Sequence, residues 1–597
     1  MMGIQFWDNL FSLFKMKDYN KLIKNLKIDF SNFNKLKIAI LGDSATQFLS
    51  NAIKAAGIER QLNFDIYEGD YNQAIPIISD SDSGLYKYNP DIIIIFFSSQ
   101  KLLNRYSSLT NIDELRSFSD HEIGTLKNLV QKIQSNLKSK IIFYNFLEIN
   151  DYVFGNFGLK LEYSFIYQIK RLNLDLMNMA VQNPDLYLLD LNSINNNFGN
   201  DNFFKSSLYI NSDVVISLDA LPTIAYQTSD IIQAFVGKFK KCLILDLDNT
   251  IWGGVIGDDG IENIQLGDLG IGKAFVELQK WIKKLKNRGV IVCVCSKNTE
   301  HIAKDPFNNH PEMILRLDDI TIFLANWESK VDNINTIQKS LNIGMDSMVF
   351  LDDNPFERNL VKQHIPEITV PELPDDPADY LNYLYKLNLF EITSFSKEDL
   401  ERTNKYQIEI QRSSAQLSYD SKEAYLSSLK MESVVDYFNE YNTPRVAQLS
   451  QRSNQFNLRT IRYGESEIKS ISSSDEYLPF VFSLDDIFGI HGLISVVILK
   501  KINTDSLFIE SWFMSCRVLQ RTMEEFTINT IVNIAKDRGY KYIYGEYIKT
   551  PKNAIVQDLL SSLGFVEDND KWEYDICSHS NQNTYITINN KSLYLKN

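Results

Sequence analysis

The stretch 243–254, Leu-Ile-Leu-Asp-Leu-Asp-Asn-Thr-Ile-Trp-Gly-Gly, constrains the fold of this chain more than any other. The short apolar run 242–245 is typical of a buried parallel strand. Directly after it come two carboxylates, Asp246 and Asp248, and a hydroxyl, Thr250. In open α/β sheets the carboxyl ends of the strands form the edge where ligands bind. The stretch therefore predicts a parallel strand with a polar site at its end.

Two further apolar strands are predicted downstream, and each also ends in polar residues. The run 290–295 leads into Ser296-Lys297-Asn298, and the run 347–351 leads into Asp352-Asp353-Asn354-Pro355. A hydroxyl before a helix offers its oxygen and free backbone amides to a phosphate. Lys330, which opens a helical segment over 331–341, can hold a phosphate as well.

The acidic residues of these strand ends indicate phosphoryl chemistry with a divalent cation. Asp246 can attack a phosphoryl group while Asp248 protonates the leaving oxygen. The pair Asp352-Asp353, joined by Asp246 and a backbone carbonyl near Asp248, makes an oxygen-rich site for Mg²⁺. Each cluster by itself is more often a plain turn or solvated surface. Four such signals at strand ends within one domain length favour an active site.

These residues resemble the haloacid dehalogenase (HAD) superfamily of phosphotransferases, whose signature is Asp-x-Asp-x-Thr, then Ser or Thr, then Lys, then an acidic pair. The longer motifs, including Asn-Trp-Glu-Ser-Lys330 and Leu-Asp352-Asp-Asn-Pro-Phe-Glu-Arg, resemble the FkbH-like branch, subfamily IIIC. The resemblance implies that Asp246 becomes an aspartyl phosphate and that Asp248 is the acid/base. The implied phosphate-binding residues are Thr250, Ser296, Lys297, Asn298 and Lys330, and the implied Mg²⁺ ligands are Asp246, Asp248, Asp352 and Asp353.

The region between the first two motifs is short, because 258–288 holds only one predicted loop and one predicted helix. We therefore expect no cap domain at that point and a site that is open to a bulky or macromolecular substrate.

Length, charge and cysteine usage limit the classes of protein to which this chain can belong. A chain of 597 residues is expected to form about three or four domains. The net charge of −15 argues against nonspecific nucleic-acid binding, and no apolar run reaches membrane-spanning length. The N-terminal residues lack the features of a secretory signal, and the five cysteines show no paired metal spacing. These features indicate a cytoplasmic protein.

The predicted fold class is multidomain α/β, with two doubly wound parallel sheets followed by a further α/β domain. Residues 1–36 read as an amphipathic helix, and 37–236 alternate between strands and helices. The HAD-like domain is assigned to 237–371, a helical linker region to 372–441, and the last domain to 442–597.

The first sheet domain begins with a strand that ends in Gly42-Asp43-Ser44, which is similar to the opening block of SGNH hydrolases. A serine nucleophile also needs a histidine base. The nearest match to the late Asp-x-x-His block is Asp219-Ala-Leu-Pro222, with proline in place of histidine. We therefore expect a non-catalytic domain, in which Asp43 and Ser44 equally well cap the next helix.

The C-terminal domain resembles GNAT-like acyltransferases in its last helix–turn–strand segment, 553–565. Its loop 517–522 contains no glycine, which argues against coenzyme A binding there. Residues considered for acyl transfer are Cys516, His491, Lys552 and Asn553. A buried small cysteine and a structural histidine are equally good interpretations of the first two.

The FkbH-like resemblance implies an enzyme with two half-reactions. The HAD site removes phosphate from a small phosphorylated C3 acid such as 1,3-bisphosphoglycerate, and the C-terminal domain passes the glyceryl group to the phosphopantetheine thiol of an acyl carrier protein. The alternative is a stand-alone Mg²⁺-dependent phosphatase for a sugar or envelope-precursor phosphate, with flanking domains that only bind substrate. A non-catalytic scaffold is a third interpretation, which the four phosphotransfer signals disfavour.

Overall fold

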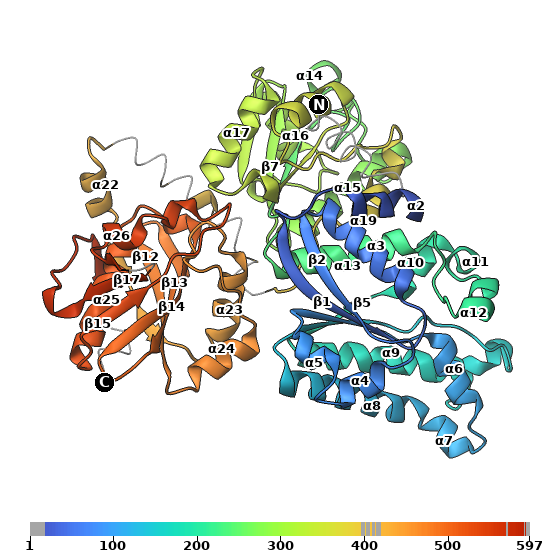
Figure 1. The fold of residues 1–597 in the computed structure, drawn as a ribbon. Coiled ribbons are helices and arrows are strands. Elements are labelled where there is room, and N and C mark those ends of the chain that lie inside the picture. The colour runs from blue at the N-terminus through green and yellow to red at the C-terminus, as the bar shows by residue number, and fades with distance from the viewer. Residues whose placement is uncertain are drawn as a thin grey trace. The chain divides into compact units, whose positions relative to one another are not determined.

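The computed structural model describes residues 18–395, 400, 406–408, 412, 419–568, 571–589 and 592. The chain divides into two compact units, Met1–Gln233 and Ala234–Asn597 (Figure 1). The first unit contains one sheet and the second contains two.

The first unit is built on a parallel five-stranded sheet with the order β2-β1-β3-β4-β5. Its strands are β1 (Asn34–Gly42), β2 (Leu62–Glu68), β3 (Ile92–Phe96), β4 (Lys140–Tyr144) and β5 (Leu186–Leu189). Its longer helices are α3 (Gln47–Glu59), α6 (Ser99–Ser107), α8 (Phe118–Asn136), α9 (Phe165–Gln182), α10 (Leu191–Phe198) and α13 (Leu221–Phe235). The shorter ones are α4 (Ala74–Ser79), α5 (Gly84–Tyr88), α7 (Ile112–Arg116), η2 (Gly155–Lys160), α11 (Asn200–Phe203) and α12 (Ser206–Ser212). The predicted doubly wound parallel sheet is confirmed.

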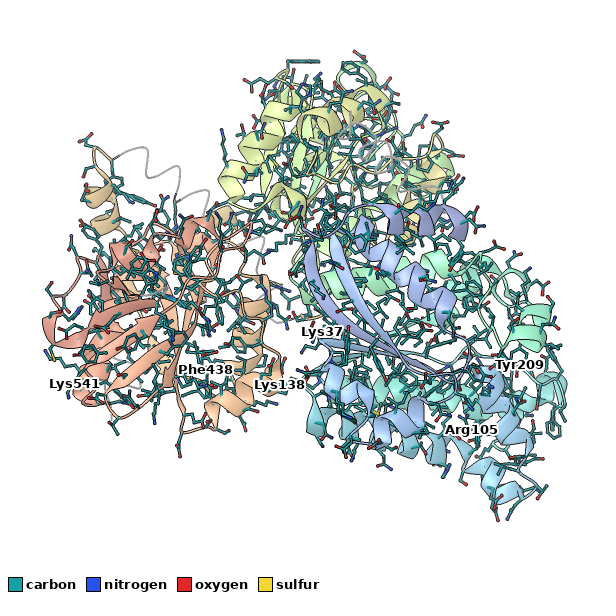
Figure 2. The ribbon with its side chains drawn as sticks, viewed as in Figure 1. Lys37, Arg105, Lys138, Tyr209, Phe438 and Lys541 are labelled. Atoms are coloured by element: carbon teal, nitrogen blue, oxygen red, sulfur yellow. The ribbon has the colours of Figure 1, made fainter. Side chains whose placement is uncertain are left out.

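Apolar packing explains why these segments form layers. All five residues of β3 are buried, as expected of an inner strand of a parallel sheet. Helices α8 and α9 bury their leucine and isoleucine faces in the same apolar cluster as strands β1 and β3 (Figure 1). Charged side chains such as Lys37 of β1 and Arg105 of α6, both labelled in Figure 2, lie outside that cluster.

The predicted N-terminal helix differs from the structure in its described part. Residues 1–17 lie outside the described range; after them come a helical turn, α2 (Tyr19–Leu22), and a 3-10 helix, η1 (Ile23–Lys27). The prediction of helix up to about residue 36 is wrong, because Asn34 already pairs with Leu62 at the start of β1. The apolar spacing that suggested a longer helix comes from side chains such as Leu22, which is fully buried.

The second unit begins with a parallel four-stranded sheet of order β8-β7-β6-β9. Its strands are β6 (Cys242–Leu245), β7 (Ile291–Ser296), β8 (Ile322–Ala325) and β9 (Met348–Leu351). Its helices are α14 (Ile256–Asp259), α15 (Gly270–Asn287), α16 (Glu300–Asn309), η3 (Leu317–Asp319), α17 (Lys330–Leu341), η4 (Met345–Ser347) and α18 (Pro355–His364). One apolar cluster joins α15 and α16 to one face of the sheet, and another joins α17 and α18 to the opposite face.

The segment 372–441, which the sequence analysis assigns to a helical linker, is divided between two neighbouring structures. It contains η5 (Pro377–Asp379), α19 (Tyr380–Leu387) and α22 (Lys422–Ser428) in its described part. Tyr380 and Leu384 of α19 belong to the apolar cluster of the four-stranded sheet. Strands β10 (Met431–Ser433) and β11 (Val435–Tyr437) pair with β12 of the last sheet, so the prediction of helix there is wrong.

The last sheet is mixed and has the order β16-β17-β15-β14-β13-β12-β10-β18, with β11 beside β12. Its remaining strands are β12 (Tyr477–Asp486), β13 (Gly489–Lys501), β14 (Ser506–Met514), β15 (Tyr542–Gly545), β16 (Val566–Asp568), β17 (Lys571–Asp575) and β18 (Ile586–Ile588). Its helices are α23 (Thr443–Arg452), α24 (Glu465–Ser472), η6 (Cys516–Val518), α25 (Met523–Asp537), η7 (Ala554–Val556), α26 (Leu559–Ser562) and η8 (Ile576–Ser578). The predicted multidomain α/β class is confirmed. None of the described helices combines the length and the apolar character that a membrane crossing requires.

Candidate active site

The carboxyl edge of the four-stranded sheet brings the predicted catalytic residues together. Strand β6 lies between β7 and β9, and Leu245 is level with Val294 on one side and Leu351 on the other. The backbone N–H of Asp246 donates to the carbonyl of Leu351 at 2.9 Å, which keeps Asp246 in line with the sheet. Asp246 therefore follows the inner strand, with the polar ends of both neighbours beside it.

Three carboxylates converge at this edge around one lysine. Asp246, Asp352 and Asp353 each offer an oxygen atom, and these atoms lie within 4.8 Å of one another. The Lys330 ammonium is 2.9 Å from Oδ2 of Asp246 and 2.5 Å from Oδ2 of Asp352. Asp352 is fully buried and the Lys330 side chain is only 3% exposed. The cluster is thus a group of three close acids, and its two buried members pair with Lys330.

Electrostatics at this cluster favour an additional positive charge. Burial and the neighbouring Asp246 raise the pKa of Asp352 to about 7. Burial and Asp246 also raise the pKa of Asp353. Burial works against the charged form of Lys330, yet Asp246 and Asp352 hold its pKa above the usual value. Oxygen ligands in this number and proximity suit a hard divalent cation such as Mg²⁺.

Asp248 has different surroundings, although it lies only two residues from Asp246. Its Oδ1 accepts hydrogen bonds from the Trp252 indole at 2.9 Å and the Ile256 amide at 3.0 Å, and its Oδ2 accepts one from the Asn298 side chain at 2.8 Å. Burial raises the pKa of Asp248, which suits a group that donates a proton. The side chain does not belong to the three-carboxylate group, and the metal ligand predicted from the sequence at this position is a backbone carbonyl near Asp248.

The sharp turn after Asp248 follows from Asn249, whose φ of 54° is a left-handed conformation that asparagine tolerates. The turn brings Thr250 back to the acidic pair. The Thr250 hydroxyl accepts a hydrogen bond from the Asp353 amide at 3.1 Å and lies 3.4 Å from an Asp353 carboxylate oxygen. Thr250 therefore ties the loop after β6 to the loop after β9.

The other predicted phosphate-binding residues lie at the same edge, with different partners. Ser296 ends β7 and is buried. The Lys297 ammonium lies 2.6 Å from Oε1 of Glu357, and Asn298 donates to Asp248 as described above. The five predicted phosphate-binding residues thus lie around the ends of β6, β7 and β9. They are Thr250, Ser296, Lys297, Asn298 and Lys330.

Glu357 and Arg358 belong to the acidic motif that carries the family resemblance, but the sequence alone assigned no role to either residue. Glu357 forms the ion pair with Lys297, and Arg358 donates to the backbone carbonyls of Asp352 at 2.9 Å and Asp353 at 2.5 Å. Both side chains are buried, although they are charged. Charged residues are rarely buried without a partner, and the charged pair that follows Asp-Asp-Asn-Pro-Phe is the sequence feature that could have indicated these two residues.

The site has no cap in the segment that joins β6 to β7. Residues 252–290, all of which the structure describes, hold only α14 and α15 besides loops. The exposed apolar side chains beside the catalytic loops are Val255 (39% exposed), Leu269 (88%), Trp327 (74%) and Phe356 (67%).

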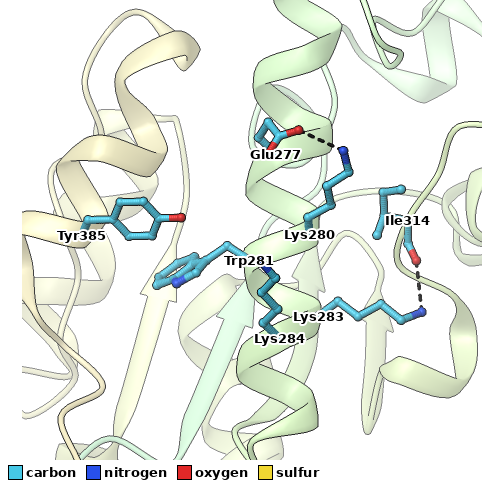
Figure 3. Close-up of a pocket in the computed structure, with 7 residues that line it drawn as sticks. All are labelled: Glu277, Lys280, Trp281, Lys283, Lys284, Ile314 and Tyr385. Carbon is cyan, nitrogen blue, oxygen red and sulfur yellow. Dashed lines mark hydrogen bonds and ion pairs between the residues drawn. The ribbon is translucent and has the colours of Figure 1, made fainter. Parts of the chain in front are cut away.

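A separate pocket lies between α15, α19 and the loop at Ile314 (Figure 3). Its volume is about 250 Å³, and it is lined by Glu277, Lys280, Trp281, Lys283, Lys284, Ile314 and Tyr385. Trp281 and Tyr385 meet edge to face with ring centroids 5.8 Å apart. Lys280 pairs with Glu277, and Lys283 donates to the carbonyl of Ile314 and pairs with Asp319. No predicted site residue lines this pocket.

The acyl-transfer candidates make mainly structural contacts. Asn553 is fully buried and uses both ends of its amide for hydrogen bonds to the loop around it. Lys552 pairs with Asp346 of η4. His491 lies 3.1 Å from both Asp486 and Arg521, and burial lowers its pKa to about 4. Cys516 is half-buried, and in the described residues no hydrogen bond or ion pair joins it to His491.

Ser44, at the end of β1, is buried and its hydroxyl has no hydrogen-bond partner in the described part of the chain. Burial raises the pKa of the adjacent Asp43 to about 6, and the Asp43 carboxylate accepts a hydrogen bond from the Ser98 amide. In the described residues no histidine forms a hydrogen bond with either side chain.

Comparison with known proteins finds a family model and a solved structure that this chain resembles. The family model described as FkbH, N-terminal domain, matches residues 37–233. The solved N-terminal part of protein BF1531 from Bacteroides fragilis, which contains a phosphatase domain and was crystallised in complex with Mg, is 53% identical. The match covers 64% of this chain and 100% of that one, with a TM-score of 0.61.

Other solved structures resemble this chain much more weakly. The ribosomal-protein-S18-alanine N-acetyltransferase from Escherichia coli is 15% identical, with a TM-score of 0.20 over 26% of this chain and 99% of that one. The GNAT domain of an S. lividans protein is 14% identical, with a TM-score of 0.19 over 24% of this chain and 89% of that one. These values carry no conclusion about activity. No curated protein matches the chain significantly.

Proposed function

This chain belongs to the FkbH family, and from that membership and the geometry of its site we propose that it is a Mg²⁺-dependent HAD-type phosphatase. The observation that carries the proposal is the group of three close carboxylates, in which the buried pair Asp246 and Asp352 shares the ammonium of Lys330. Such a surplus of oxygen acceptors is costly unless a cation offsets it.

Each of three residues has a distinct role in phosphoryl transfer. Asp246 attacks phosphorus, forming an aspartyl phosphate as the bond to the leaving oxygen breaks. Asp248, whose pKa is raised by burial, gives a proton to that oxygen and then removes a proton from the water that hydrolyses the intermediate. Lys330 holds the transferring oxygens and offsets their charge.

Asp246, Asp352 and Asp353 would hold Mg²⁺, which would supply positive charge that reduces repulsion between the phosphate and the attacking carboxylate. The relative with the phosphatase domain was crystallised with Mg, which supports the same cation here.

We propose further that the substrate is a small phosphorylated C3 acid of the 1,3-bisphosphoglycerate type, and that the glyceryl group is loaded onto an acyl carrier protein. FkbH family membership supports this assignment. The HAD site hydrolyses the phosphate ester at C3. The phosphopantetheine thiol attacks the acyl phosphate carbonyl at C1 and releases that phosphate, so thioester formation requires no nucleotide. The catalytic edge lacks a cap between β6 and β7, which leaves room for a macromolecular acceptor.

The experiment is to incubate the full chain with Mg²⁺, 1,3-bisphosphoglycerate and a set of acyl carrier proteins. Phosphate release is measured together with the intact mass of each carrier. A glyceryl mass on one carrier supports the proposal, and phosphate release without any such mass refutes the loading step. Asp246→Asn is the matched control for the chemistry at the HAD site.

A second variant tests the thioester route. If Cys516 carries the glyceryl group, Cys516→Ala retains phosphate release and loses carrier loading. Wild-type enzyme mixed with donor alone then yields a hydroxylamine-labile adduct on the Cys516 peptide. Unimpaired loading by Cys516→Ala removes this cysteine from the mechanism.

A second candidate function is a stand-alone phosphatase for a sugar or envelope-precursor phosphate. The contacts of the acyl-transfer candidates favour it, because Asn553 and His491 are engaged inside the domain. Turnover of such phosphates with no loading of any carrier distinguishes this function from the first.

A further inference from the structure

The ion pair between Lys297 and Glu357 crosses the end of the strand that carries the predicted nucleophile. Lys297 directly follows β7, and Glu357 lies in the first turn of α18, directly after the β9 loop. Strand β6 lies between β7 and β9. Since neighbouring strands are about 4.8 Å apart, the pair spans about 10 Å over the carboxyl end of β6.

Side-chain alternation places this pair on the same face of the sheet as Asp246. Cys293 and Cys295 of β7 and Ile244 of β6 all belong to the apolar cluster that α17 and α18 cover. Because side chains alternate along a strand, continuing this pattern by two residues brings Asp246 and Lys297 to that face. Consistent with this, the charges of Lys330, Asp246, Asp352 and Glu357 all act on the pKa of Cys295.

Glu357 has one carboxylate oxygen that nothing in the described residues satisfies. Its Oε1 lies 2.6 Å from the Lys297 ammonium, whereas its Oε2 is buried and lacks a hydrogen-bond partner in the part of the chain described. Only 6% of Glu357 is exposed, while the Lys297 side chain is 37% exposed. A buried acceptor without a donor is unfavourable, which implies that a donor arrives with a ligand.

We propose that Glu357 determines substrate specificity, by accepting a hydrogen bond on Oε2 from a hydroxyl group close to the phosphorylated carbon of the substrate. This inference rests on the proposed phosphatase function and narrows its substrate class to phosphorylated hydroxy compounds. Lys297 keeps the carboxylate in place through Oε1 and leaves Oε2 to the ligand. An analogue without the hydroxyl leaves Oε2 buried without a donor, so the site discriminates against it.

The test compares two probes that differ by one hydroxyl group, 3-phosphoglycerate and its 2-deoxy analogue 3-(phosphonooxy)propanoate. The value of kcat/KM for phosphate release in the presence of Mg²⁺ is measured for both. We expect wild-type enzyme to prefer the hydroxylated probe at least tenfold. Glu357→Leu, which removes the acceptor and retains the volume, brings the ratio close to one. Glu357→Gln retains one acceptor oxygen, so its ratio of kcat/KM values for the two probes lies between those of the wild type and of Glu357→Leu.

Lys297→Met is the matched control, because it removes the partner of Oε1 and leaves Oε2. It lowers kcat/KM for both probes and retains the preference between them. If Glu357 only positions Lys297, Glu357→Leu and Lys297→Met behave alike and neither changes the ratio. That result, or a wild-type enzyme that does not discriminate between the probes, overturns the assignment.

Binding of the same probes to Asp246→Asn separates this inference from the proposed function. Titration calorimetry measures the dissociation constants of both probes without turnover. The two proteins compared are Asp246→Asn and the double variant Asp246→Asn/Glu357→Leu. A hydroxyl preference in binding, together with no turnover by wild type, refutes the phosphatase and supports Glu357. Turnover of both probes at equal efficiency refutes the role of Glu357 and leaves the phosphatase intact. Thermal melting of each variant identifies any loss caused by unfolding.

Discussion

Two buried ionic clusters in the second unit balance their charges in opposite ways. At the end of β6, the carboxylates of Asp246, Asp352 and Asp353 surround the one ammonium of Lys330. In the last domain, the single carboxylate of Asp486 is fully buried and accepts hydrogen bonds from several donors. These are Arg412 at 2.7 Å, Phe488 N at 2.9 Å, His491 at 3.1 Å, Gly489 N at 3.2 Å and Arg521 at 3.4 Å.

The pKa values of the two clusters express this difference. Burial and Asp246 raise the pKa of Asp352 to about 7. Burial also acts on Asp486, but hydrogen bonds from His491 and Arg412 hold its pKa well below the usual range. A surplus of acceptors favours the binding of a cation, whereas an acceptor surrounded by donors stabilises a fold. We therefore expect variants of the first cluster to lose activity and variants of the second to lose stability.

The largest expected effect is that of Asp246→Asn on phosphate release. Replacing the attacking carboxylate by an amide removes the nucleophile and should lower kcat by about 10³-fold or more. The same change removes one negative charge from a crowded cluster, so the melting temperature should not fall. Phosphate release from a generic ester with Mg²⁺ measures the first effect, and calorimetry measures the second. Near-wild-type turnover contradicts the HAD assignment.

Asp486→Asn is the corresponding change in the second cluster. It leaves two buried guanidinium groups facing a neutral amide and should cost about 3–5 kcal/mol of unfolding free energy. Urea unfolding followed by tryptophan fluorescence measures this loss. Asp505→Asn is the matched control, because Asp505 forms an exposed ion pair with Lys541 and its loss should leave the unfolding midpoint unchanged. Equal midpoints for the two variants argue against a structural role of the Asp486 cluster.

The sequence was sufficient for much of the fold and for the catalytic edge. The apolar runs of β1, β6 and β9 identify parallel strands without help from tertiary contacts, and the residues that end them therefore meet. Short strands such as β10 and β11 were missed, because their stability comes from pairing with β12.

Contacts between distant segments explain what the sequence could not provide at the site. The partner of Lys297 is Glu357, 60 residues away, and local spacing does not predict that pairing. The distinction between Asp246 and Asp248 likewise depends on Asn298, which reaches Asp248 from the next strand. The sequence therefore predicts which residues gather at the edge, and the fold decides which of them face one another.

The pH dependence of stability should reflect His491. Its pKa is about 4 in the folded protein and about 6.5 when unfolded, so the unfolded state binds the proton more tightly. Stability is then full above about pH 6.5 and declines as the pH falls from 6.5 toward 4, by about 2 kcal/mol between pH 7 and pH 5. Urea midpoints at the two pH values measure this decline. In His491→Gln the loss of unfolding free energy between pH 7 and pH 5 should be smaller by about 2 kcal/mol. If the loss is the same as in the wild type, other titrating groups cause it.

The smallest expected effect is that of Ser44→Ala, which tests a buried polar group that belongs to neither kind of cluster. The Ser44 hydroxyl is buried without a hydrogen-bond partner in the described residues. Because removing an unsatisfied hydroxyl loses no hydrogen bond, stability should change by less than about 1 kcal/mol, and phosphate release should stay within about twofold of wild type. Thr46→Val is the matched control, since its hydroxyl donates to Glu68 at 2.7 Å and its loss should cost about 1–2 kcal/mol. An esterase activity of the wild type that disappears with Ser44→Ala contradicts this view, because it requires a base that reaches Ser44 from another part of the chain.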